Sequence, residues 1–128
     1  MAFKLGSEKR GMKSSKNISF ANKVVRENGD MGPGVVAQAN NDGSIDVDPN
    51  VDLNSDFGQK VMKHELKHTE QMEDGRADYG DNWVMWEGKI YVRKEENGEL
   101  IIDGPNGKWP EGHPNHPWEA EAIQAETE

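Results

Sequence analysis

The sequence predicts a single α+β domain in which one central helix packs on a small antiparallel sheet. Three observations predict this class. Residues 54–75 repeat apolar and histidine side chains at helical spacing, residues 82–104 have the pattern of three short strands, and residues 117–126 have that of a short second helix. A length of 128 residues suits one domain.

Composition limits how such a domain is stabilised. Only 33% of the residues are hydrophobic and 14 are glycine, so the core is small and much of the chain lies in loops. Domains of this kind often need a disulfide, a metal or a partner. The chain has no cysteine, which excludes disulfides and thiolate metal sites.

Charge is distributed unevenly along the chain. The net charge is −9, yet residues 1–26 hold seven basic residues against one acidic residue, which leaves an acidic body. An acidic body argues against nucleic-acid binding. No apolar run approaches the roughly 18 residues that a membrane span needs. The basic N-terminus has no apolar segment behind it, so we expect no secretion signal.

The N-terminal half predicts an arm followed by short strands. Residues 1–18 are polar and without period, so we expect an extended basic arm before a single domain at 19–128. Residues 20–28 fit a short strand or one helical turn. The β-prone runs 35–40 and 44–49 flank an Asp-Gly turn and predict a strand pair. We expect the first run to form a sheet edge that can pair with an extended peptide.

The central helix is predicted from its caps and its periodicity. Asn54 or Ser55 can cap its beginning, and Gly75 supplies the stop. The side chains expected on one face recur at spacings of three and four: Phe57, Val61, His64, His68 and Met72.

Beyond the helix, turn signals divide the chain into a meander. Strands are predicted at 83–86, 89–94 and 99–102, followed by a loop rich in proline and glycine at 104–117. Pro117 suits the first turn of the short terminal helix. We expect the tryptophans to form the small core with the central helix: Trp83, Trp86, Trp109 and Trp118.

His64 and His68 are one helical turn apart, so their imidazoles point the same way and one tetrahedral Zn²⁺ can take a nitrogen from each. Glu65 lies about 100° round the helix from His64 and can reach a water on the metal as a general base, following the H-E-x-x-H pattern. The alternative is an amphipathic helix with two histidines near its core face, in an acidic interaction module without metal.

A third ligand must come from elsewhere in the chain, and the candidates are His113, His116, Glu119 and Glu121. Glu119 falls in the first turn of the short helix, on a segment stiffened by prolines, where its carboxylate can be aimed at the histidines. A set of two histidines and one glutamate leaves the fourth position for water, as in catalytic zinc sites.

The HELKH sequence followed by PWEAEA (117–122) resembles the gluzincin metallopeptidases, in which a distal E-x-E-A or E-x-x-x-D opens a second helix. The resemblance implies a minimal zincin-like domain with Glu119 as the third ligand. Where that pattern has an aspartate four residues after the ligand, this chain has Ile123.

The activity expected from this set is zinc-dependent hydrolysis of a peptide or protein substrate, with Glu65 passing a proton from water to the leaving amine. The oxyanion needs a further donor. Tyr79, Tyr91 and His116 are candidates, and we favour Tyr91.

A second resemblance extends along nearly the whole chain. The blocks MAFKLG, AQANNDGSIDVDP, VMKHELKHTEQM, YGDNWVMWEGKIYVRK and HPWE are similar, in the same order, to short proteins encoded by tailed marine phages. Those proteins are usually labelled structural or uncharacterised. The resemblance implies a phage protein located in the virion or the host cytoplasm. It also implies a role as a structural subunit on a peptidase-like scaffold, whose basic arm docks on other virion proteins.

Overall fold

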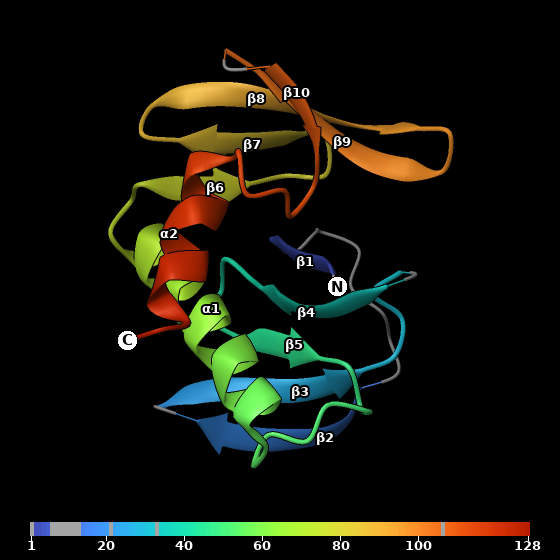
Figure 1. Cartoon of the computed structure of the whole chain (residues 1–128), viewed down its shortest axis with the longest axis vertical. Helices are drawn as coiled ribbons and strands as arrows, with labels where there is room; N and C mark the ends of the chain where they lie inside the picture. Colours follow the sequence, from blue (N-terminus) through green and yellow to red (C-terminus); the bar gives the residue numbers. More distant parts are fainter. Residues whose placement is uncertain (1, 6–13, 21, 33, 106) are drawn as a thin grey trace.

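The computed structural model describes residues 2–5, 14–20, 22–32, 34–105 and 107–128, with side-chain detail at Leu5 and from Asn22 onward. These residues form two helices and two five-stranded sheets, which Figure 1 shows one above the other. The predicted α+β class is therefore confirmed, with two sheets where we expected one. Among the described residues, no helix combines the length and the hydrophobicity that crossing a bilayer requires.

Sheet A, the lower sheet in Figure 1, has the strand order β1-β4-β5-β3-β2. The β4–β5 and β2–β3 pairs are antiparallel, whereas β1 pairs with β4 and β3 with β5 in parallel. The pair predicted around the Asp-Gly turn is confirmed as β4 and β5. The strands are β1 (Ala2–Leu5), β2 (Ser14–Phe20), β3 (Lys23–Asn28), β4 (Val35–Ala39) and β5 (Ile45–Val47).

The N-terminal part of sheet A differs from what the sequence led us to expect. The strand β4 is not a sheet edge, because β1 lies along its outer side. Both β1 and the beginning of β2 fall within the stretch expected as an arm, 1–18, of which residues 6–13 lie outside the described residues. An edge strand needs only backbone hydrogen bonds to one neighbour, so a polar segment without periodicity can form one.

Sheet B is an antiparallel meander in the order β10-β9-β8-β7-β6. The three predicted strands are confirmed as β7, β8 and β9, and the Asn97-Gly98 turn between the last two has the positive φ angles of a type I′ hairpin (54° and 80°). The segment 104–117, expected as a loop, contributes β10. The strands are β6 (Ala77–Tyr79), β7 (Trp83–Trp86), β8 (Lys89–Glu96), β9 (Glu99–Gly104) and β10 (Gly107–Pro110).

Both predicted helices are present. The helix α1 (Asp56–Glu73) is capped by Ser55, whose Oγ accepts a hydrogen bond of 2.9 Å from the backbone N–H of Gly58. Gly75, at φ +75°, follows its end. The helix α2 (Pro117–Ala125) has proline in its first turn and packs beside α1 (Figure 1).

The buried apolar residues form two clusters. One joins α1 to sheet A and consists of Val25, Ala37, Ile45, Val47, Val61 and Met62. The other joins α2 and β1 to sheet B and consists of Leu5, Ala77, Tyr79, Val84, Trp86, Tyr91, Ile102 and Trp118. The expected tryptophan core is thus half right. Trp86 and Trp118 are buried, whereas Trp83 is 36% exposed on the outer face and Trp109 is half-buried at the periphery.

Candidate metal centre

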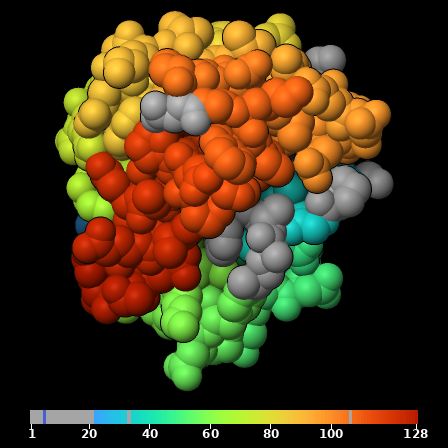
Figure 2. Space-filling model, turned by 45° about the horizontal axis from the view of Figure 1, so that its top comes forward, coloured from blue at the N-terminus to red at the C-terminus, as the bar shows by residue number. Residues whose placement is uncertain are grey.

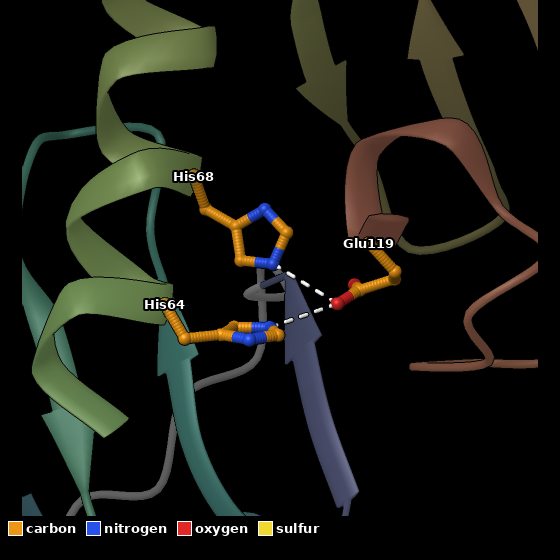
Figure 3. A group of neighbouring side chains, drawn as sticks. All are labelled: His64, His68 and Glu119. Atoms are coloured by element: carbon orange, nitrogen blue, oxygen red, sulfur yellow. Dashed lines mark hydrogen bonds and ion pairs between the residues drawn. The ribbon is translucent and has the colours of Figure 1, made fainter. Parts of the chain in front are cut away.

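The helix α1 presents His64 and His68 on the face that looks toward α2. Their ring centroids are 4.8 Å apart with the rings inclined at 72°, and both Nε2 atoms point at one oxygen of Glu119 (Figure 3). The distance to Glu119 Oε1 is 2.9 Å from His64 Nε2 and 3.2 Å from His68 Nε2. All three side chains are fully buried. The sequence-predicted triad is therefore assembled in the fold.

Glu119 is held in place by the residue before it. Trp118 is fully buried, stacks on His116 at a centroid distance of 4.7 Å and 5° inclination, and meets Tyr91 edge to face at 4.9 Å. Pro117 fixes the backbone that enters α2. This packing anchors the first turn of α2 to sheet B, so that the carboxylate of Glu119 points at α1.

The outer nitrogen of each imidazole meets a hydrogen-bond acceptor. His64 Nδ1 lies 2.8 Å from the Glu126 carboxylate, and His68 Nδ1 lies 3.0 Å from Gln71 Oε1. The orientation of the Gln71 amide follows from its surroundings, because its Nε2 faces two acceptors, the Trp118 carbonyl and a Glu121 oxygen. Both Nδ1 atoms must therefore carry the proton and donate it.

With Nδ1 protonated, each Nε2 of a neutral imidazole directs a lone pair at the Glu119 oxygen. Lone pairs on both partners repel, so the arrangement needs positive charge between the nitrogens and the carboxylate. Protons on Nε2 supply that charge in one state, and a cation supplies it in another. The site thus has the electron-pair arrangement of a metal centre, with each ligand histidine oriented by a contact on its far side.

The pKa values of His64, His68 and Glu119 reflect the same interaction between the two imidazoles and the carboxylate. Burial alone would lower the pKa of His68, but the Glu119 charge and the hydrogen bond to it raise that pKa to about 9. For His64, burial again lowers the pKa, but the hydrogen bond to Glu119 together with the charges of Glu65 and Glu119 raises it overall. Burial alone would raise the pKa of Glu119, but the charge of His68 and the bonds from both imidazoles lower it to about 2.

Glu65 lies next to this triad on α1 and has an unusual environment. Its side chain is fully buried, and neither carboxylate oxygen has a hydrogen-bond partner among the described residues. Burial raises the pKa of Glu65 to about 7, while the nearby imidazoles oppose that shift. The second oxygen of Glu119 is buried and unpartnered in the same way. Buried carboxylate oxygens without partners are expected where a cation or its water completes the site.

The donor set fits zinc. The ligand atoms of His64, His68 and Glu119 lie within 4.8 Å of one another. Two atoms bound to a tetrahedral zinc at 2.0–2.1 Å are about 3.3 Å apart, close to both Nε2–Oε1 distances here. Two imidazoles and one carboxylate are ligands of zinc in proteins, whereas Ca²⁺ and Mg²⁺ are bound mainly by oxygen.

The competing third ligands have other contacts. His116 Nε2 donates toward the carbonyls of Trp109 and Pro110, and burial lowers its pKa. His113 stacks on Trp109 at 4.8 Å. Glu121 accepts hydrogen bonds from the guanidinium of Arg76.

The two candidate tyrosines are also placed by other groups. Tyr91 packs its ring against Trp118, and burial followed by the charge of Glu87 raises its pKa. The Tyr79 hydroxyl accepts a hydrogen bond from the backbone N–H of Asn41. Neither contact involves the triad, so the oxyanion role assigned to Tyr91 stays a prediction.

Sequence reasoning missed the two residues that orient the histidines. Glu126 follows α2, and its carboxylate lies 2.8 Å from His64 Nδ1. Gln71 lies three residues after His68 on α1, a spacing that places the two side chains on one face. That spacing was a usable signal for Gln71. No signal in the sequence indicated Glu126, because its position depends on how α2 lies across α1.

Comparisons with known proteins found no match: no family model, no curated protein and no solved structure corresponds to this chain. The functional interpretation of the site therefore depends on its geometry and its chemistry.

Proposed function

We propose that this chain is a zinc-dependent peptidase built on a minimal zincin-like domain. One observation carries the proposal. Two imidazole Nε2 atoms and a carboxylate oxygen converge in a fully buried site, while each Nδ1 donates to an acceptor that orients its ring. An amphipathic helix with two core histidines has no need of a carboxylate aimed at both lone pairs.

Three protein ligands, His64, His68 and Glu119, would hold the zinc and leave a position for water or substrate, the pattern of catalytic sites. When bound, zinc lowers the pKa of its water to about 7 and polarises the scissile carbonyl.

The remaining steps belong to side chains of the chain itself. Glu65, one residue from the first ligand, accepts a proton from the attacking water and returns it to the leaving amine. Gln71 and Glu126 keep the imidazoles in the tautomer that offers Nε2 to the metal.

The complete burial of the three ligand side chains favours a second candidate. A metal held between α1 and α2, closed off from solvent, would stabilise a small-cored domain without turnover. This matches the structural role implied by the resemblance to phage proteins.

Metal analysis tests the part that both candidates share. The chain is stripped with a chelator, reloaded with Zn²⁺, dialysed and analysed for metal. We expect one zinc per chain, lost in His64→Ala, His68→Ala and Glu119→Gln. His113→Ala is the matched control and should keep its zinc, because that histidine stacks on Trp109 outside the site.

Activity separates the two candidates. Unfolded proteins are incubated with the zinc-loaded chain, and the products are analysed by mass spectrometry beside Glu65→Gln. Cleavage by the wild type alone supports the peptidase. Zinc binding without cleavage above the Glu65→Gln level rejects the peptidase and supports the structural centre.

A further inference from the structure

Arg76 lies between the end of α1 and the beginning of β6, and its guanidinium contacts three other parts of the fold. It lies over the ring of Trp86, 4.6 Å from the centroid. It donates hydrogen bonds of 3.2 and 2.9 Å to the carboxylate of Glu87 in the β7–β8 turn. It also donates to both oxygens of Glu121 on α2, at 3.0 and 2.5 Å. Arg76 therefore ties α2 to sheet B, which Figure 2 shows in contact at the surface (red, and yellow to orange).

The Glu121 carboxylate extends this network to the metal centre. Its Oε1, which accepts from Arg76, lies 3.2 Å from Gln71 Nε2. Gln71 Oε1 in turn lies 3.0 Å from His68 Nδ1. The side chains of Arg76 and Glu121 are 35% and 36% exposed, whereas Gln71 and His68 are fully buried. Three consecutive contacts thus connect a surface guanidinium to a buried imidazole of the candidate site.

The chemistry of the groups fixes the direction of each contact. A guanidinium only donates hydrogen bonds, and an ionised carboxylate only accepts them. The amide NH₂ of Gln71 must therefore face Glu121, as it also faces the Trp118 carbonyl, and the amide oxygen must face His68. His68 then donates from Nδ1 and keeps Nε2 for the metal. A half-exposed carboxylate is weakly held on its own, and the paired bonds from Arg76 keep Glu121 in position.

We propose that Arg76 is a positioning residue of the metal centre: through Glu121 it fixes the amide contact that holds the His68 imidazole in the tautomer and orientation that bind zinc. This rests on the proposed function, since it concerns a ligand of the same site. Contacts behind a ligand histidine are worth about 10- to 100-fold in metal affinity. Arg76 acts from two contacts further out, and the Trp118 carbonyl still holds the amide without it, so we expect Arg76→Met to weaken zinc binding about threefold.

The sign of this effect separates positioning from charge. Arg76→Met removes a positive charge from a chain of net charge −9, which by itself would strengthen the binding of a divalent cation. Methionine keeps an apolar side chain over Trp86, with favourable contact between sulfur and ring. Arg76→Lys keeps the charge but not the paired bonds of the guanidinium fork, so its affinity should lie between those of the wild type and Arg76→Met. It takes the place of Arg76→Met if that variant does not fold.

Two measurements on the full chain test the proposal. Competition with a fluorescent zinc chelator gives the affinity. In the metal-free chain labelled with ¹⁵N-histidine, NMR gives the rate at which the Nδ1 proton of His68 exchanges with water. We expect this exchange to be about threefold faster in Arg76→Met, since the contact that protects the proton opens more often. The Nδ1 proton of His64, which faces Glu126, is the internal control and should be unaffected.

A double-variant cycle tests the route through Glu121. In the Glu121→Ala background, Arg76→Met should cause no further weakening of zinc binding and no further acceleration at His68, because the connection is already broken. A full effect of Arg76→Met in that background would overturn the inference.

The inference would also be overturned by unchanged exchange at His68 in Arg76→Met, or by equal acceleration at His64 and His68, which indicates general loosening. In a chain that binds zinc, unchanged or tighter binding by Arg76→Met would overturn it as well. If no sample binds zinc, the proposed function fails, and exchange in the metal-free chain still decides whether Arg76 positions His68.

Discussion

Replacing Glu126 with alanine removes the acceptor that meets His64 Nδ1 at 2.8 Å. Contacts behind a ligand histidine are worth about 10- to 100-fold in metal affinity. The Glu126 side chain is 22% exposed, so water replaces part of the lost contact. We therefore expect the low end of that range, a zinc affinity about tenfold weaker, or about 1.4 kcal/mol.

Glu126→Gln divides this effect into its two components. The amide keeps an acceptor oxygen but loses the charge, and charge-assisted hydrogen bonds are about twice as strong as neutral ones. The expected loss is therefore about half, near 0.7 kcal/mol or about threefold. Competition between the chain and a fluorescent zinc chelator at fixed pH measures both variants. The matched control is Glu70→Ala on the exposed side of α1, which pairs with Lys67 and should change affinity by less than about twofold.

An unchanged zinc affinity in Glu126→Ala would refute this reasoning. The same holds if Glu126→Ala and Glu70→Ala weaken binding equally, because the effect would then be general electrostatics and not orientation of His64.

Three more predictions follow from the site. Glu65→Gln should retain one zinc per chain by metal analysis while cleavage of unfolded protein falls to background, because we assign Glu65 the role of base and not of ligand. Trp118→Ala should lower the free energy of unfolding by about 3–5 kcal/mol in urea titrations, against less than about 1 kcal/mol for the partly exposed Trp83→Ala. In the chain stripped of metal by a chelator, the interaction of protonated His68 with Glu119, which raises the pKa of His68, stabilises the fold fully below pH 6.5. That stabilisation is lost as the pH rises through about 9. The lowered pKa of Glu119 contributes stability above pH 4.5 that is lost as pH falls toward 2, so melting temperatures should decline at both ends.

Much of the fold was predictable because its signals are local. The caps and periodicity of α1, the hairpin turns of the meander and the proline at the start of α2 each act within a few residues. The edge strands were not predictable. The strands β1, β6 and β10 have three or four residues each, and their pairing partners are chosen by tertiary packing.

The residues of the candidate metal centre likewise divide into those with a local signal in the sequence and those without one. His64 and His68 were predicted from their spacing on a single helix. Glu119 was predicted from the resemblance of PWEAEA to the gluzincin pattern, together with its place at the start of a second helix. The contact that Glu126 makes with His64 depends on how the two helices cross, which no spacing in the sequence records. Glu126 is 62 residues from His64, and only the packing of α2 on α1 brings them together.

The burial of the site was also beyond sequence reasoning. The expected open strand at 35–40 is covered by β1, and the ligand side chains are fully buried. An apolar pattern predicts which residues face the core, but it does not predict which segment of a polar N-terminal stretch covers an edge.

Both proposed functions require that His64, His68 and Glu119 bind a single zinc ion. Crystals of the zinc-loaded chain, measured at the zinc absorption edge, test it most directly. We expect one anomalous peak, about 2.0–2.2 Å from both Nε2 atoms and from a Glu119 oxygen. A folded chain whose only zinc peaks lie elsewhere, at His113 or among surface carboxylates, would contradict it.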